Sequence, residues 1–151
     1  MRTWLRKILQ VRDTPEAQAR GLAIGVFFGI SPLFGLQTLL AIALSHLTQG
    51  NKVLAVAGTA VSNPITSLPL YGACYAVGRT LLGGTSPLPD WSTLTSTSAL
   101  IALGPRFLLE LAVGSMLVAG LGGLATYLLS SRLLGLLGRW SRRSAEQPAE
   151  G

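Results

Sequence analysis

The stretch from Gly21 to Asn51 contains no charged residue, and it constrains the fold more than any other feature of the sequence. As one straight helix it would extend about 45 Å, whereas the hydrocarbon core of a bilayer is about 30 Å thick. The segment Ser31-Pro32-Leu33-Phe34-Gly35 lies inside this stretch. Because proline removes a backbone donor and glycine tolerates unusual dihedral angles, we expect two half-helices, about 15–31 and 36–48.

A second uncharged stretch, from Val53 to Gly78, repeats this layout. Its interruption is Ser62-Asn63-Pro64-Ile65-Thr66, and Pro69 follows closely. The predicted broken segments are therefore 15–48 and 52–82, with helix breaks at Pro32, Gly35, Pro64 and Pro69. Half-helices of about ten residues reach only about 15 Å, so each segment forms either a hairpin that turns back at the bilayer midplane or one broken crossing. The sequence does not distinguish these two forms.

The composition indicates that lipid surrounds most of the chain. Hydrophobic residues make up 49% and charged residues 12%, with a mean hydropathy of +0.50, whereas about a quarter of a soluble domain is charged. We therefore expect an all-α integral membrane protein, a small multi-pass helical domain over residues 14–131.

The remaining segments are expected to complete this domain and to flank it. A polar loop is predicted at 83–91, a Ser/Thr-rich helix at 92–104 and a transmembrane helix at 106–131. The segments that flank the domain are an interfacial amphipathic helix at 1–13, a basic interfacial helix at 132–143 and a disordered tail at 144–151.

The net charge of +6 arises from basic residues that cluster near the two ends of the chain. They do not form the aromatic and polar surface that nucleic-acid binding requires, so we expect no nucleic-acid partner. By the positive-inside rule, both termini should face the cytoplasm from the bacterial cytoplasmic (inner) membrane. The lipid bilayer is then the main partner, and anionic lipids should contact both termini.

The sequence contains none of the common catalytic signatures. The patterns GxSxG, GxxxxGK, HExxH and CxxC are all absent, and each encodes a geometry that its chemistry requires. One cysteine, Cys74, and one histidine, His46, are too few for a disulfide framework or a cysteine-based metal site. We therefore expect no enzyme activity, no cofactor and no metal.

Polar side chains accompany both interruptions and are the candidate substrate-binding residues. Gln37 and Thr38 follow the first interruption, and Asn63 and Thr66 lie within the second. Unwound backbone at membrane depth must be satisfied by protein or by a water-filled cavity. These side chains therefore either satisfy the freed backbone or, together with the half-helix N-termini, bind an anionic group, as in transporters with discontinuous helices.

Charged residues within or near the apolar stretches form two pairs at a spacing of four, Glu16 with Arg20 and Arg106 with Glu110, so each pair shares a helix face. Ionisable groups inside a membrane are costly and often functional. In that interpretation Arg20, Arg79 and Arg106 attract an anion, and Glu16 or Glu110 couples a proton. Alternatively, both pairs are interfacial and neutralise themselves at the headgroup level.

Three glycines, Gly21, Gly25 and Gly29, recur every four residues and so line one helical face. A stripe of small residues lets another helix backbone approach closely, which makes it a helix-packing signal. The functional alternative is a smooth path for a lipid chain.

Several of these motifs together resemble the bacterial membrane family called domain of unknown function 2062. The resemblance is carried by Pro15-Glu16, Ala23-Ile24-Gly25-Val26-Phe27, Pro32-x-x-Gly35-x-Gln37-Thr38, Asn51-Lys52, Ser62-Asn63-Pro64-x-Thr66, Pro69 and Tyr71. It covers residues 15–79 closely and extends loosely to 131. It implies a small multi-pass membrane domain with signature positions at Glu16, Pro32, Gly35, Gln37, Asn63, Pro64 and Thr66, and it implies no particular activity.

Two hypotheses about function follow from the sequence. In the first, the interrupted segments meet near the midplane and form a site that transports or translocates an anionic lipid headgroup or an ion. In the second, the protein is a non-catalytic membrane scaffold or accessory subunit that binds another membrane protein, or a second copy of itself, through its glycine stripe and interfacial helices.

Overall fold

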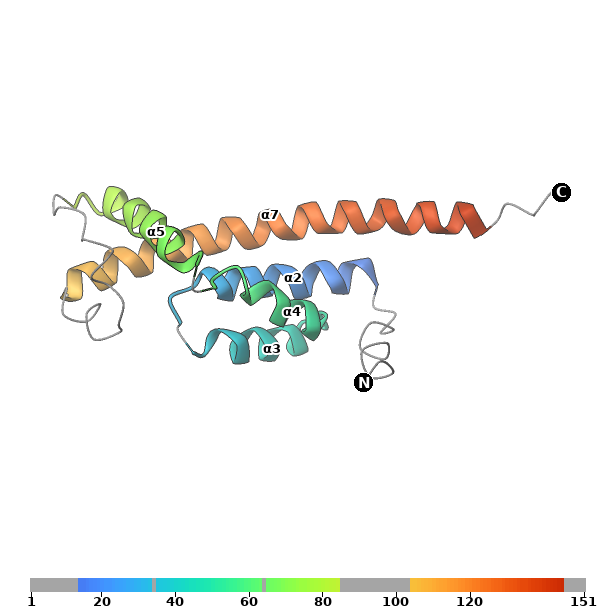
Figure 1. Ribbon diagram of the computed structural model, residues 1–151, viewed down its shortest axis with the longest axis horizontal. Coiled ribbons are helices and arrows are strands. Elements are labelled where there is room, and N and C mark those ends of the chain that lie inside the picture. Colours follow the sequence, from blue (N-terminus) through green and yellow to red (C-terminus); the bar gives the residue numbers. More distant parts are fainter. Residues whose placement is uncertain (1–13, 34, 64, 85–103, 146–151) are drawn as a thin grey trace.

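The computed structural model describes residues 14–33, 35–63, 65–84 and 104–145, and side chains only as far as residue 136. Over these residues the protein is all-helical, as predicted, and contains no strand (Figure 1). The predictions for residues 1–13, 92–103 and 146–151, and for most of the 83–91 loop, lie outside the described residues. The helices are α2 (Pro15–Ile30), α3 (Gln37–Leu47), α4 (Lys52–Thr59), α5 (Ser67–Leu81) and α7 (Pro105–Ala145).

Helix α2 begins and ends where its sequence provides the signals. Its first turn starts at Pro15, and the Thr14 hydroxyl accepts a hydrogen bond of 3.2 Å from the backbone N–H of Ala17. A proline at the first helical position needs no backbone donor there, and the threonine satisfies one of the free N–H groups. The helix ends after Ile30 because Ser31 is extended, the conformation favoured before a proline such as Pro32.

Helices α2 and α3 form an antiparallel hairpin. Gly35 turns the chain with a φ of +81°, a left-handed conformation that glycine adopts without strain. Helix α3 then returns toward the start of α2, because the N–H of Asn51, just after α3, donates a 2.8 Å hydrogen bond to the Ala17 carbonyl. The interruption after Ser31 therefore reverses the direction of the chain.

Helix α4 runs parallel to α2, with the two backbones in close contact. Methyl groups added at Gly21 and Gly25 would collide with the backbone of Asn51 and Ala55, and one added at Gly29 would lie 2.6 Å from the Val61 Cγ1 atom and 3.1 Å from the Thr59 backbone. The N-terminus of α4 is capped by Asn51, whose side-chain oxygen accepts a 2.8 Å hydrogen bond from the Leu54 N–H. The contacts run in the same order along both helices, Gly21 with Asn51, Gly25 with Ala55 and Gly29 with Thr59.

Helix α5 continues in the direction of α4 and packs antiparallel to the first part of α7. Glycines again permit the approach: a methyl group at Gly78 would overlap the Glu110 carbonyl, and one at Gly114 would overlap the Cys74 carbonyl. The second interruption thus joins two helices that progress in the same direction, unlike the first.

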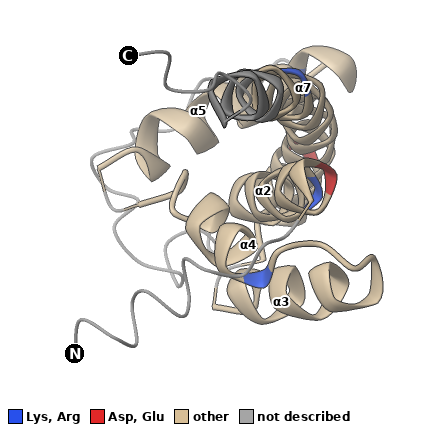
Figure 2. Ribbon diagram, turned by 90° about the vertical axis from the view of Figure 1, so that its right-hand side faces the viewer, with Lys and Arg blue, Asp and Glu red and all other residues tan. Residues whose placement is uncertain are grey.

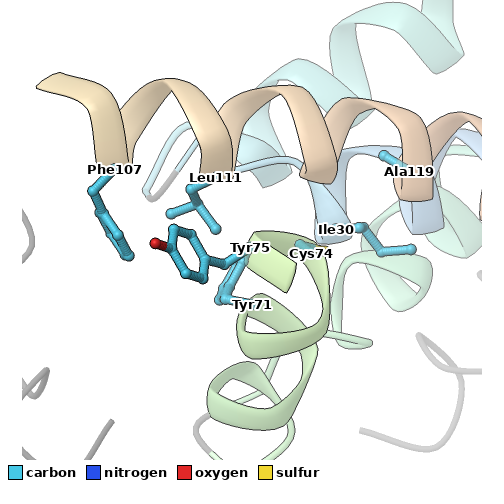
Figure 3. Close-up of a cluster of buried hydrophobic side chains, with 7 residues drawn as sticks. All are labelled: Ile30, Tyr71, Cys74, Tyr75, Phe107, Leu111 and Ala119. Atoms are coloured by element: carbon cyan, nitrogen blue, oxygen red, sulfur yellow. The ribbon is translucent and has the colours of Figure 1, made fainter. Parts of the chain in front are cut away.

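The buried core joins α5 to α7 and to the end of α2 (Figure 3). The rings of Tyr75 and Phe107 lie 4.7 Å apart between their centroids, within the range of favourable aromatic pairs. Ile30 packs at the other side of the cluster, beside Ala119. The full cluster is Ile30, Tyr71, Cys74, Tyr75, Phe107, Leu111 and Ala119.

Helix α7 is continuous from Pro105 to Ala145. The sequence predicted a membrane helix at 106–131 and a separate interfacial helix at 132–143, but no boundary divides them. The predicted tail, at 144–151, begins inside α7. No proline ends the helix near that boundary. The Ser131 hydroxyl donates back to the Leu128 carbonyl at 3.1 Å, which lets the serine remain helical.

One described helix is long and apolar enough to cross a membrane by itself, and it is the Pro105–Leu136 part of α7. Helices α2, α3, α4 and α5 are shorter. The multi-pass arrangement expected from the sequence therefore does not follow from helix length.

Candidate functional site

The two interruptions meet in space. The Ser62 hydroxyl lies 3.5 Å from the side-chain oxygen of Gln37, and the hydroxyls of Thr38 and Thr59 also lie 3.5 Å apart. Both distances are at the long limit for hydrogen bonds between oxygen atoms, so these pairs are weakly held. We call this region the break junction and define it as Gln37, Thr38, Thr59, Ser62 and Tyr71.

Tyr71 connects the break junction to the end of α2. Its hydroxyl donates to the Gly29 carbonyl at 3.5 Å and also forms a hydrogen bond with Ser62. Next to it, the fully buried Ser31 hydroxyl donates to the Phe27 carbonyl at 2.9 Å. Two carbonyls near the C-terminal end of α2, those of Phe27 and Gly29, thereby accept side-chain hydrogen bonds from Ser31 and Tyr71.

Asn63 and Thr66 form a tighter set of bonds within the second interruption. The Asn63 side-chain oxygen accepts from the N–H groups of Ile65 and Thr66, at 2.9 and 3.0 Å. The Thr66 hydroxyl donates to the Val61 carbonyl at 2.6 Å and accepts from the Asn63 N–H at 3.1 Å. Both side chains therefore satisfy backbone groups that the interruption frees, and their role toward a ligand is untested.

The break junction lies beside the part of α7 that is midway between Arg106 and Arg132. Ile30, at the end of α2, packs beside Ala119, and a methyl group added at Gly122 would lie 3.0 Å from its Cδ1 atom. At 1.5 Å per residue, Ala119 is about 20 Å along the axis from Arg106 and about 20 Å from Arg132. The interruptions are therefore about equally far from Arg106 and from Arg132 along this helix.

Charged residues are sparse on the helices (Figure 2). One group lies where α5 meets α7: Arg79, Arg106 and Glu110. The Glu110 side chain is 1% exposed, and its carboxylate forms an ion pair with the Nε atom of Arg106 at 3.1 Å. The Tyr75 hydroxyl also forms a hydrogen bond with Glu110.

The other group lies where α2 and α4 begin and comprises Glu16, Arg20 and Lys52, with Arg132 of the antiparallel α7 toward the same end. We call this the basic end. Glu16 is exposed, and among the described residues no ion pair joins it to Arg20. The buried Arg20 Nε atom has no hydrogen-bond partner in the described part of the chain. Of the two pairs of charged residues that are spaced four apart, only Arg106 and Glu110 form an ion pair among the described residues.

The structure thus brings some predicted site residues together and separates others. Gln37 and Thr38 meet Ser62 and Thr59, whereas the predicted anion-attracting arginines lie toward the two ends. Pro69 was predicted as a helix break, but it lies in the first turn of α5 and does not interrupt it. A proline is tolerated there because first-turn N–H groups have no intrahelical acceptor. Pro64 lies outside the described residues.

Sequence reasoning missed two members of the break junction, Thr59 and Tyr71, as site residues. Thr59 is the last residue of α4, and Tyr71 lies one turn into α5. Polar side chains about one turn from a break can reach freed backbone or the opposite break. That position relative to the prolines was the available signal.

Potential metal ligands are not grouped in the described residues: no cluster of three or more His, Cys, Asp or Glu side chains could hold an ion there. The site is instead a meeting of helix ends. The C-terminal ends of α2 and α4 and the N-terminal ends of α3 and α5 all lie at the two interruptions.

These features define a class of small helical proteins in which one span-length helix packs against two interrupted helical segments. The family model described as an uncharacterised protein conserved in bacteria, domain of unknown function 2062, matches residues 1–144. The chain belongs to this family, as its motifs predicted. No curated protein and no solved structure matches the chain.

Proposed function

We propose that the protein is a multi-pass protein of the bacterial cytoplasmic membrane. In this arrangement α7 crosses once, α4 and α5 together make a second, broken crossing, and α2 with α3 forms a hairpin that enters and leaves from one side. The hairpin follows from the reversal after Ser31, and the broken crossing follows from the common direction of α4 and α5.

Apolar side chains on the surface support this placement. Large hydrophobic side chains are exposed on α3, α4, α5 and α7, including Leu39, Val56, Leu68 and Leu121. A water-soluble chain of this size would place polar residues over most of these faces. The Arg106-to-Arg132 part of α7 rises about 39 Å, enough for a hydrocarbon core of about 30 Å with an interface on each side.

The charge distribution supports an orientation. The basic end carries Arg20, Lys52 and Arg132, and Arg139, Arg142 and Arg143 follow near the end of α7. At the opposite end, Glu110 offsets part of the charge of Arg79 and Arg106. By the positive-inside rule, the basic end faces the cytoplasm, so both termini lie on that side.

We infer that the break junction is the site where an anionic lipid headgroup or an ion is handled during transport or translocation. One observation carries this inference: two interruptions from separate segments meet beside α7 midway between Arg106 and Arg132, where lipid would otherwise surround the chain in the proposed placement. The meeting helix ends supply partial positive charge from N–H groups and partial negative charge from carbonyls. The side-chain contacts between Gln37 and Ser62 and between Thr38 and Thr59 are both 3.5 Å long, and a ligand could replace them.

Charged groups at the two ends complete the proposal. Arg20, Arg79 and Arg106 would attract the anion from either side, and Glu16 or Glu110 would couple a proton. Asn63 and Thr66 would act mainly by holding the second interruption in shape.

The test is a flux measurement with purified protein in liposomes that contain phosphatidylglycerol. Movement of fluorescent phosphatidylglycerol between leaflets and chloride flux are measured separately. We expect wild-type protein to accelerate one of them, and Gln37→Ala combined with Thr38→Val to lose most of that activity. The matched control is Thr80→Ala, which removes a threonine that bonds only to the Ala76 carbonyl of its own helix.

Equal activity in wild-type protein and in the Gln37→Ala, Thr38→Val variant would reject the break junction as the site. Absence of both fluxes, together with a single stoichiometric partner that co-purifies from membranes, would favour the scaffold hypothesis. An apolar face such as that of α3 can contact a membrane protein as readily as lipid.

A further inference from the structure

Glu110 lies at the centre of a charged cluster that the break junction does not include. Its buried carboxylate contacts the Arg106 Nε atom at 3.1 Å and the Tyr75 hydroxyl. The turn after α5 closes over it, because a methyl group added at Gly84 would lie 2.5 Å from the Glu110 Oε1 atom. The carboxylate is therefore enclosed between α5, α7 and this turn.

Arg79 adds a second cation to the same cluster. The methyl group at Gly84 would also lie 2.8 Å from the Cγ atom of Arg79, so this side chain borders the Glu110 carboxylate. Within the described parts of the chain, the buried Nε atom of Arg79 has no hydrogen-bond partner. The cluster thus holds two guanidinium groups and one carboxylate.

Among the described residues, one positive charge in the cluster, that of Arg79, has no carboxylate of its own. Arg79 is half-buried, and its buried Nε atom loses hydration without a hydrogen bond in return, which is costly for that N–H group. A ligand with one negative charge would neutralise the cluster. Guanidinium groups match phosphate oxygens especially well, since their planar N–H groups can donate two parallel hydrogen bonds.

The surroundings indicate which kind of phosphate fits. Exposed leucines lie within three residues of Arg79 or Arg106 in the sequence and are between 39% and 58% exposed: Leu81, Leu82, Leu108 and Leu109. Free phosphate gains nothing from an apolar surface, whereas the acyl chains of a phospholipid do. In the proposed placement the cluster lies at the end of α7 away from the cytoplasm, at headgroup level.

We propose that this cluster binds an anionic phospholipid of the outer leaflet, with a singly charged phosphodiester as in phosphatidylglycerol. Arg79 and Arg106 bind the phosphate, Glu110 holds Arg106 in position, and the exposed leucines contact the acyl chains. The site rests on the membrane placement proposed above, but not on transport at the break junction.

The test measures lipid binding to the purified full-length chain in a neutral detergent. Dioctanoyl phosphatidylglycerol, dioctanoyl phosphatidylcholine and inorganic phosphate are titrated separately, and bound lipid is counted by native mass spectrometry. We expect phosphatidylglycerol to bind at least about tenfold more tightly than either alternative, because only it combines a net negative charge with acyl chains. Equal binding of phosphatidylcholine, or tighter binding of inorganic phosphate, would overturn the proposal.

Variants locate the binding on the chain. Arg79→Gln should weaken phosphatidylglycerol binding about tenfold, and Arg79→Lys should weaken it less, because lysine keeps the charge but not the planar donors. The control Arg132→Gln removes the same charge from the basic end and should leave binding unchanged. If Arg79→Gln does not fold, Arg79→Lys carries the test, and wild-type affinity in that variant counts against Arg79.

Lipid binding and transport can fail separately. In the Gln37→Ala, Thr38→Val variant, the part of phosphatidylglycerol binding that Arg79→Gln removes should persist even where flux is lost. If this variant loses lipid binding while Arg79→Gln retains it, the lipid is bound at the break junction and the cluster is not the site.

Discussion

Gly25 and Gly58 lie back to back where α2 crosses α4. A methyl group added at Gly25 would lie 2.8 Å from the Cα atom of Gly58, and one added at Gly58 would lie 2.9 Å from the Cα atom of Gly25. Neither neighbour is a flexible side chain that could turn away. The contact fixes the relative position of two parallel helices, and both interruptions begin at the ends of these helices.

Gly25→Ala should therefore destabilise the protein, by about 1–3 kcal/mol, because two backbones must separate to admit the methyl group. The matched control is Gly120→Ala on α7, where an added methyl group would meet nothing within 4 Å. That variant should be stabilised by about 0.5–1 kcal/mol, because alanine loses less backbone entropy in a helix. Thermal unfolding in detergent measures both. A Gly25→Ala protein as stable as Gly120→Ala would mean that the two helices do not pack as described.

Asn63 should matter through the bonds that its side chain accepts from the backbone. Asn63→Ala removes the acceptor for the Ile65 and Thr66 N–H groups and should cost about 0.5–2 kcal/mol, as loss of a helix cap does. Asn63→Ser keeps a side-chain oxygen near the same place without adding a charge at membrane depth, and it should retain more of the stability than Asn63→Ala. Thermal unfolding and flux are measured on both variants. If both variants lose flux while both remain as stable as wild type, the asparagine acts on a ligand rather than on the turn.

The interruptions could be predicted from the sequence because their causes are local. The extended Ser31 before a proline and the positive φ of Gly35 depend on neighbouring residues, so α2 and α3 lie within two residues of the predicted half-helices. Whether the chain reverses at a break or continues in the same direction depends on contacts between residues that are far apart in the sequence. The bond from Asn51 to Ala17 closes the hairpin, and the contact of Gly78 with Glu110 directs α5 along α7.

Spacing alone also could not decide which charged side chains would pair. Arg106 and Glu110 share the i,i+4 spacing of Glu16 and Arg20, but only Glu110 is enclosed by α5 and the Gly84 turn. Exposed Glu16 gains little from an ion pair, because water and salt screen the attraction. Burial is set by tertiary packing, which the spacing does not encode.

A double-mutant cycle on Arg106 and Glu110 should detect a coupling of about 1–2 kcal/mol. Arg106→Gln leaves a buried carboxylate without its nearest cation, and Glu110→Gln removes the charge that needs compensation. The value is modest because the Arg106 side chain is 66% exposed and partly screened. Unfolding free energies of both single variants and the double variant give the coupling.

The control cycle uses Glu16→Gln and Arg20→Gln, which should be additive because these residues form no ion pair. Equal coupling in the two cycles would show that the geometry around Glu110 confers no special interaction.

Cysteine labelling in intact cells and in inverted membrane vesicles should distinguish the two interrupted segments. In a Cys74→Ala background, Lys52→Cys is expected to react only from the cytoplasmic side and Leu82→Cys only from the opposite side, because α4 and α5 together cross the membrane. Leu36→Cys, which is 56% exposed in the protein, should be protected from both sides, because lipid surrounds the hairpin turn and a thiol in that medium does not ionise to the reactive thiolate. Thr48→Cys, at the end of the returning α3, should react from the same side as Lys52→Cys. If Lys52→Cys and Leu82→Cys react from the same side, the second segment is a hairpin rather than a broken crossing. Rapid labelling of Leu36→Cys would show that the first interruption lies in water rather than at the bilayer midplane.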